Sequence, residues 1–104
     1  MPRYALLSHD WPTPHLDLLL EDGAACRTWR LPALPEPGAS VAAERLADHR
    51  LFYLDHEGPV SGGRGRVRRV AAGMFDWVED GERVVIDLDG LGRLVLEGGT
   101  ASRG

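Results

Sequence analysis

Turn-forming residues interrupt this 104-residue sequence every eight to twelve positions, and this spacing is the strongest constraint on its fold. The runs between the turns are short and rich in leucine and valine, which is typical of a small all-β domain. The predicted strands are Tyr4 to His9, His15 to Glu21, Ala25 to Leu31, Arg50 to Glu57, Gly65 to Ala71, Phe75 to Glu79, Glu82 to Leu88 and Arg93 to Glu97. We therefore predict one all-β domain over residues 1–104, folded as a compact antiparallel β-barrel of about eight short strands.

The segments between these strands indicate how the strands connect. Asp22-Gly23, Asp80-Gly81 and Asp89-Gly90 each offer a residue that tolerates positive φ, so hairpin turns are expected there. The segment Pro32 to Ser40 is rich in proline, which lacks the backbone N–H needed for regular hydrogen bonding. We therefore predict an irregular surface connection there. The segment Ser40 to Asp48 fits either a short helix capped by Ser40 or a strand. The glycine-rich tail after Glu97 is expected to be frayed.

Composition restricts the classes of protein that this chain can belong to. No apolar run approaches the roughly 20 residues that a membrane span needs, and the first residues do not resemble a secretory signal. A cytoplasmic location is therefore the expectation, with no membrane partner. The single cysteine, Cys26, cannot form an internal disulfide, and we expect it to be a small buried residue.

Charge is unevenly distributed along the chain. The net charge of −4 argues against binding of nucleic acid over the whole surface. Between Gly58 and Gly73, however, there are four arginines and no acidic residue. These are Arg64, Arg66, Arg68 and Arg69. A row of arginines can contact phosphates, but it can equally form a solvated strand face.

A candidate metal site lies at the start of the second predicted strand. A period of two puts His15 and Asp17 on one face, with Cα atoms about 6.5 to 7 Å apart. The opposite face, expected in the core, consists of Leu16, Leu18 and Leu20. The turn with Pro12 and Pro14 can bring His9 over the polar face. Two imidazoles and one carboxylate suit a divalent transition metal with open positions for water or substrate. Alternatively, both histidines end strands and Asp17 makes a local hydrogen bond.

A second polar group lies further along the chain. If the segment from His49 is extended, His49 and Tyr53 share a face, from which both can contact a phosphate or transfer a proton. The alternative is a histidine at a strand end and a tyrosine with a buried ring and an exposed hydroxyl.

Four motifs in the same order resemble the 3′-phosphoesterase domain of bacterial DNA ligase D, a family that also occurs as small free-standing proteins. The resemblance extends from Tyr4 to about Trp77. The motifs are HD with the following HLDLLLE (residues 9–10 and 15–21), RTWRLP (27–32), DHRLFYLDHEGPV (48–60) and a glycine-containing turn before an arginine-bearing strand.

This resemblance implies a compact β-barrel with a Mn²⁺ ion in a surface groove, although another divalent transition metal can take that place. The implied metal ligands are His9, His15 and Asp17, and the residues implied to line the same groove are His49 and Tyr53. The family trims DNA 3′ ends that carry a ribonucleotide or a phosphate, so the implied partners are DNA or RNA–DNA 3′ ends and a separate ligase or polymerase.

The sequence departs from the family at phosphate-binding positions. Family members carry arginine two residues after the metal-binding aspartate, whereas this chain has Leu19; Val41 and Ala47 are two further departures. Arg45, Arg64 and Arg66 are the candidates to contact phosphate instead. The sequence thus predicts a metal-dependent 3′-phosphoesterase, and the alternative is a module of the same fold that binds nucleic-acid ends or a repair partner without turnover.

Overall fold

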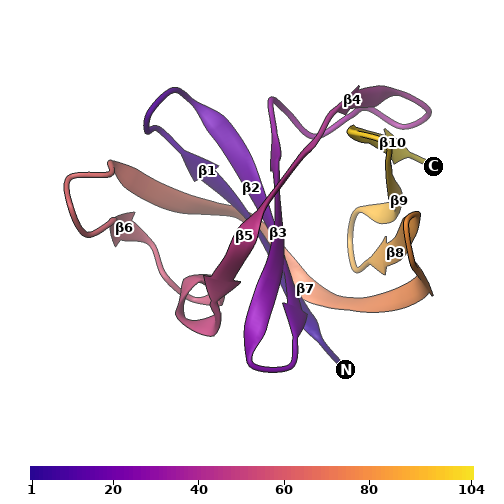
Figure 1. Ribbon diagram of the computed structural model, residues 1–104, viewed down its shortest axis with the longest axis horizontal. Coiled ribbons are helices and arrows are strands. Elements are labelled where there is room, and N and C mark those ends of the chain that lie inside the picture. Colours follow the sequence, from indigo (N-terminus) through magenta and orange to yellow (C-terminus); the bar gives the residue numbers. More distant parts are fainter.

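The computed structural model describes residues 1–104, whose strands form one antiparallel sheet (Figure 1). The elements are β1 (Arg3–His9), β2 (His15–Asp22), β3 (Ala25–Leu31), β4 (Ser40–Ala42), β5 (Glu44–Arg50), the 3₁₀ turn η1 (Leu51–Leu54), β6 (Gly58–Pro59), β7 (Arg66–Asp80), β8 (Val84–Leu88), β9 (Gly92–Glu97) and β10 (Thr100–Arg103). Their order in the sheet is β4-β10-β9-β8-β7-β1-β2-β3-β5, and β6 pairs with β7. The prediction of an all-β antiparallel fold is confirmed.

The sheet does not close into a barrel, so that part of the prediction is wrong. β4 and β5 are the two end strands and do not pair with each other. They follow one another in the chain, separated by Ala43, whose N–H donates to the carbonyl of Gly99. The segment Ser40 to Asp48, for which the sequence allowed either a helix or a strand, therefore forms two strands, one at each end of the sheet.

One long strand joins the two halves of the sheet. β7 pairs with β1 from Val67 to Met74 and with β8 from Phe75 to Asp80. Figure 1 shows β7 passing under the other strands, from β6 on one side to β8 on the other. The sequence predicted two separate strands here, Gly65 to Ala71 and Phe75 to Glu79. Gly73 lies between those ranges and allows close packing, since a Cβ there would lie 3.4 Å from the Tyr4 ring.

Hydrophobic clusters cover both faces of the central strands. The larger cluster contains 14 buried residues, including Leu18 and Leu20 from β2 and Phe75 from β7. A second cluster of 7 residues lies on the opposite face. The second cluster consists of Ala5, Leu7, Leu19, Cys26, Leu54, Val60 and Val67. Strand β2 is therefore buried on both faces, whereas the sequence predicted a polar second face.

The predicted strand from Arg50 to Glu57 is not formed. β5 ends at Arg50, and η1 follows, with the N–H of Asp55 donating to the carbonyl of Phe52. Three residues per 3₁₀ turn bring Leu51 and Leu54 to the same side, where both pack against the second cluster. No helix of this protein is long and apolar enough to cross a membrane.

The C-terminal segment is ordered into β10, so the prediction of a frayed tail is wrong. Gly98 and Gly99 both have positive φ, as a two-residue hairpin turn requires. β10 then pairs with β9 on one side and with β4 on the other. Irregular structure from Pro32 to Ala39 agrees with the proline-rich connection expected there.

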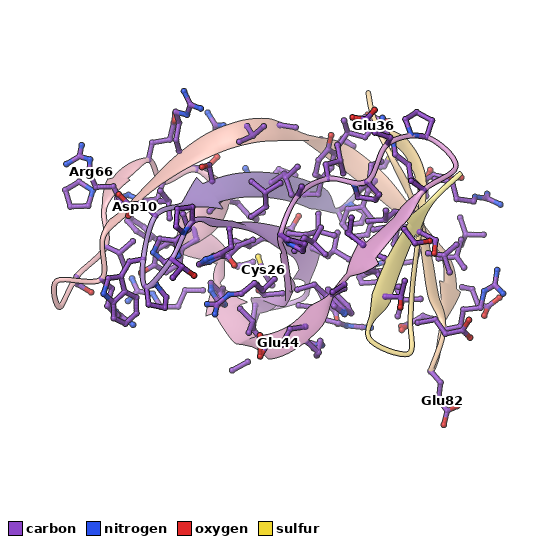
Figure 2. The ribbon with its side chains drawn as sticks, turned by 90° about the horizontal axis from the view of Figure 1, so that it is seen from above. Asp10, Cys26, Glu36, Glu44, Arg66 and Glu82 are labelled. Carbon is purple, nitrogen blue, oxygen red and sulfur yellow. The ribbon has the colours of Figure 1, made fainter.

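Cys26 is expected to become reactive only when the protein opens. Its side chain is fully buried in the second cluster, in the interior seen in Figure 2. Burial, with a smaller contribution from the negative charge of Glu21, raises the pKa of the thiol from 9.0 to about 11. The folded state thus disfavours the thiolate relative to the unfolded state. The protonated thiol therefore contributes its full share to the free energy of unfolding below pH 9, and this share is lost as the pH rises through about 11.

Two measurements check this expectation. Alkylation of Cys26 at pH 8 should be slow in buffer and fast in urea, because the thiolate is the reacting form. The urea midpoint of the wild type should fall between pH 9 and pH 11 more than that of Cys26→Ala. Fast alkylation of the folded protein at pH 8 would contradict the burial of this thiol.

Candidate metal centre

The first hairpin brings the three predicted metal ligands together. In the β1–β2 pair, His9 lies directly opposite His15, and Asp17 lies opposite Leu7. Residues two apart on a strand share a face, and so do residues directly opposite each other. His9, His15 and Asp17 therefore project from the same face of the sheet as the second cluster.

The three side chains are close enough to bind one ion. Their ligand atoms all lie within 4.8 Å of one another. Nδ1 of His9 is 3.3 Å from Oδ2 of Asp17, and Nε2 of His15 is 3.2 Å from Oδ1 of the same carboxylate. Neighbouring ligands about 2.1 Å from one ion are about 3 Å apart in octahedral geometry. His15 and Asp17 are buried, at 7% and 3% exposure.

Backbone carbonyls fix the orientation of both imidazoles. Nε2–H of His9 donates to the carbonyl of Arg64 at 2.8 Å, and Nδ1–H of His15 donates to the carbonyl of Thr13 at 2.7 Å. A carbonyl oxygen can only accept, so these nitrogens carry the protons in the neutral rings. The other nitrogen of each ring then presents a lone pair to Asp17. Such outer hydrogen bonds are usual for metal-binding histidines.

The inner atoms of this cluster lack a donor. Nε2 of His15 and Oδ1 of Asp17 are buried and have no hydrogen-bond partner, although they are only 3.2 Å apart. A second proton on His9 satisfies Oδ2 of Asp17 but leaves this pair unchanged. A cation between the three side chains satisfies all of them, and two nitrogens with one oxygen suit Mn²⁺, Fe²⁺ or Zn²⁺. The residues present thus fit the predicted divalent ion.

A groove of about 450 Å³ opens beside the cluster. Its lining residues come from β1, β2, β3, β5, β7, η1 and the loops that precede β2 and β7. The lining consists of Leu7, His9, Trp11, Asp17, Arg30, Leu46, Ala47, Asp48, His49, Arg50, Tyr53, Val60, Ser61, Arg64 and Val67. His15 does not line the groove.

His49 and Tyr53 line this groove, but not on one extended strand as the sequence predicted. His49 is in β5 and Tyr53 is in η1, with ring centroids 6.0 Å apart. Nδ1–H of His49 donates to the carbonyl of Ala47 at 3.0 Å. Nε2 of His49 is therefore the nitrogen available to a ligand.

Of the three arginines predicted to contact phosphate, one lines the groove. Arg64 does so and donates to the carbonyl and hydroxyl oxygens of Ser61. Arg45 instead stacks on Trp29 and donates to Asp48. Arg66 also lies outside the groove, next to Asp10 at one end of the molecule (Figure 2).

Two groove arginines were missed in the sequence, Arg30 and Arg50. Arg30 was detectable, because the hairpin turn at Asp22-Gly23 sets the register of β2 and β3 and so places Arg30 opposite Asp17. For Arg50 there was no such signal, since its position depends on the end of β5 at η1.

Gly65→Ala is expected to destabilise the loop that supports His9. Gly65 has φ +76°, and a Cβ there would lie 2.6 Å from Cβ of Trp11 and in collision with the carboxylate of Asp10. Asp10 accepts a hydrogen bond from the N–H of Arg66 at 2.8 Å, so the contact joins the loop to the first hairpin. Strain and collision together should lower the free energy of unfolding by about 2 to 4 kcal/mol.

Gly62→Ala is a matched control for this loss. Gly62 has the same φ of +76°, but a Cβ there would meet only Nε of Arg64, at 3.7 Å. Urea unfolding should show a smaller loss for Gly62→Ala than for Gly65→Ala. Equal losses would mean that backbone strain alone matters and that the contact with Asp10 and Trp11 does not.

Comparison with known proteins gives no further information on this site. No family model matches the chain, and no curated protein matches it.

Proposed function

We propose that this protein is a divalent-metal-dependent phosphoesterase that acts on the 3′ ends of nucleic acids, as its resemblance to the 3′-phosphoesterase domain of DNA ligase D implies. The observation that carries the proposal is the cluster of His9, His15 and Asp17, in which the buried Nε2 of His15 and Oδ1 of Asp17 converge without a hydrogen-bond partner. The cluster borders a groove that also contains His49 and three arginines.

The charges that line the groove favour an anionic substrate. Arg30, Arg50 and Arg64 form none of the ion pairs in the protein. The lining carboxylates are Asp17, which belongs to the metal cluster, and Asp48, which pairs with Arg45. A phosphate that enters the groove thus meets uncompensated positive charge.

The metal cluster, the groove arginines, His49 and Tyr53 each have a role in the proposed hydrolysis. A divalent ion held by His9, His15 and Asp17 would stabilise negative charge on the phosphoryl oxygens as a Lewis acid. The groove arginines hold the phosphate. Water attacks phosphorus, the bond to the 3′ oxygen breaks, and the protonated His49 gives the Nε2 proton to that oxygen while the water proton passes to solvent. Tyr53 packs against the His49 ring and limits its orientation.

Two DNA primers test this function, one that ends in a 3′-phosphate and one that ends in a single ribonucleotide. Incubation with Mn²⁺ and protein at the concentration of the primer should remove the terminal group, and chelation should stop the reaction. Absence of metal-stimulated trimming from both primers, with metal shown to be bound, would refute the proposal.

His49→Ala should lower the rate of trimming by about 100- to 10,000-fold, because general acid catalysis contributes about that much. His56→Ala is the matched control. His56 donates through Nε2 to the carbonyl of Pro59 and does not line the groove. Single-turnover rates of both variants separate the proton transfer from substrate binding, and equal rates would remove His49 from the mechanism.

A second candidate function is binding of nucleic-acid ends without turnover. It is favoured by the unpaired groove arginines, which can hold a phosphate whether or not hydrolysis follows. In that case His49→Ala would leave the affinity for 3′-phosphorylated ends intact, the affinity would fall with salt, and no product would form with any metal.

A further inference from the structure

Arg30 belongs to the RTWRLP segment (27–32) and lies next to the metal cluster, although the sequence alone did not mark it as a site residue. In the β2–β3 pair it lies directly opposite Asp17. Opposed residues of an antiparallel pair have Cβ atoms about 4.5 to 5.5 Å apart and project from the same face. Arg30 and Asp17 both line the groove, so the guanidinium lies on the groove side of the sheet.

The guanidinium of Arg30 has no protein partner. Its Nε is buried and makes no hydrogen bond, and Arg30 forms no ion pair. Glu44 is opposite Arg30 on the next strand but does not pair with it. Arg27 and Arg93, in contrast, each hold a carboxylate with two hydrogen bonds. A partly buried arginine without an acceptor is unfavourable for stability, which indicates that its acceptor is a ligand.

The carboxylate opposite Arg30 in the β2–β3 pair is already committed. Asp17 has both oxygens directed at the two histidines. A divalent cation bound by Asp17 neutralises its carboxylate, so Asp17 cannot also pair with Arg30. The cation itself also attracts anions. The ligand that fits between the cation and the Arg30 guanidinium is therefore an oxyanion with several equivalent oxygens, which a planar guanidinium binds through two donors.

We propose that Arg30 is a phosphate-positioning residue, which holds the non-bridging oxygens of the phosphate group beside the His9, His15 and Asp17 site. This inference rests on the proposed phosphoesterase function and names the residue that orients its substrate. Arg50 and Arg64 also add positive charge to the lining of the groove, whereas Arg30 sets the position of the phosphate relative to the metal ligands.

Sulfate titration tests the inference, because sulfate has the shape of phosphate, cannot be hydrolysed and stays soluble with Mn²⁺. Calorimetry should compare wild type, Arg30→Gln and Arg30→Lys, each with and without Mn²⁺. We expect Arg30→Gln to weaken sulfate binding by about 10- to 100-fold, as loss of a charged hydrogen-bonding partner does, and to leave Mn²⁺ affinity unchanged or higher. Arg30→Lys should recover part of the loss.

Arg83→Gln is the matched control for charge. Arg83 lies in the turn between β7 and β8, pairs weakly with Glu79 at 3.8 Å and does not line the groove. Sulfate affinity of this variant should equal that of wild type. Equal sulfate affinity of wild type and Arg30→Gln, or no sulfate binding to wild type at all, would overturn the role of Arg30.

Thermal unfolding separates this role from a structural one. Arg30→Met keeps the length of the side chain and removes the unpartnered donor, so its melting temperature should equal or exceed that of wild type. A clear decrease would mean that Arg30 supports the fold, which would overturn the inference.

The metal-free titration keeps the inference distinct from the proposed function. A protein that binds no Mn²⁺ and cleaves no primer can still show loss of sulfate binding in Arg30→Gln, whereas an active enzyme with unchanged sulfate binding refutes only the role of Arg30.

Discussion

Asp17→Asn should abolish the response of this protein to divalent metal. In the wild type, Mn²⁺ or Zn²⁺ at 100 times its Kd should stabilise the folded state by about 2.7 kcal/mol. For a domain of this size that raises the melting temperature by roughly 10 °C or more. The asparagine amide carries no charge, and we expect metal affinity to fall by about 100-fold or more, which removes the shift and any trimming activity.

The metal-free stability of the same variant gives an independent readout. Nε2 of His15 and Oδ1 of Asp17 face each other without a proton in the wild type. An amide NH₂ at position 17 supplies a donor to one of the imidazoles, so Asp17→Asn should be at least as stable as wild type without metal. Loss of function through misfolding is thereby distinguished from loss of a ligand.

Asp48→Asn is the matched control for Asp17→Asn. Asp48 also lines the groove, but it is exposed and pairs with Arg45 at 3.0 Å. The metal-induced shift in melting temperature should remain in this variant. If metal fails to stabilise the wild type, or stabilises Asp17→Asn equally, the three side chains do not form a metal site.

Leu19→Arg should unfold the protein rather than restore the arginine found at the matching position of the family that the sequence resembles. Leu19 has 0% exposure and packs in the second cluster with Leu7 and Cys26. A buried charge without a partner destabilises by about 3 to 5 kcal/mol. The longer side chain adds about 1 to 3 kcal/mol from overpacking. Small domains are stable by only about 5 to 15 kcal/mol, so a large fraction of the variant should be unfolded at 37 °C.

Leu19→Met controls for the change of shape, since a volume-conserving substitution should cost less than about 1.5 kcal/mol. Urea unfolding followed by circular dichroism gives both values. A folded Leu19→Arg variant with higher trimming activity would show that this face of β2 is open to solvent and that Arg30 does not compensate for the missing arginine.

Local patterns in the sequence predicted the first three strands because turn residues separate them, a proline-containing turn after His9 and Asp22-Gly23 after Glu21. They also predicted that His9, His15 and Asp17 converge, since these residues belong to one hairpin and need no distant partner to face each other. Errors arose where tertiary contacts decide which secondary structure forms. Two strands were predicted where β7 runs unbroken through Gly73, which packs against Tyr4, and a strand was predicted from Arg50 to Glu57 where η1 forms.

The composition of the groove depended on the same distant contacts. Arg45 and Arg66 were candidates because neighbouring strands could supply an arginine to the phosphate, yet Arg45 stacks on Trp29 and Arg66 lies outside the groove. The second cluster was also missed, since η1 and Val60 cover β2 from far along the chain. Periodicity thus indicated which residues share a face of a strand, but not what covers that face.

The hydrogen bond from His9 to the carbonyl of Arg64 spans 55 positions of the sequence and joins one residue of the candidate metal site to the loop that carries a groove arginine. An ion that fixes the His9 ring also restrains this carbonyl, and with it the guanidinium of Arg64. Linkage makes such an effect reciprocal, so an oxyanion that immobilises the loop must tighten the hold on the ion by the same factor. Cation and anion should therefore bind this protein with positive cooperativity, and each should dissociate more slowly in the presence of the other.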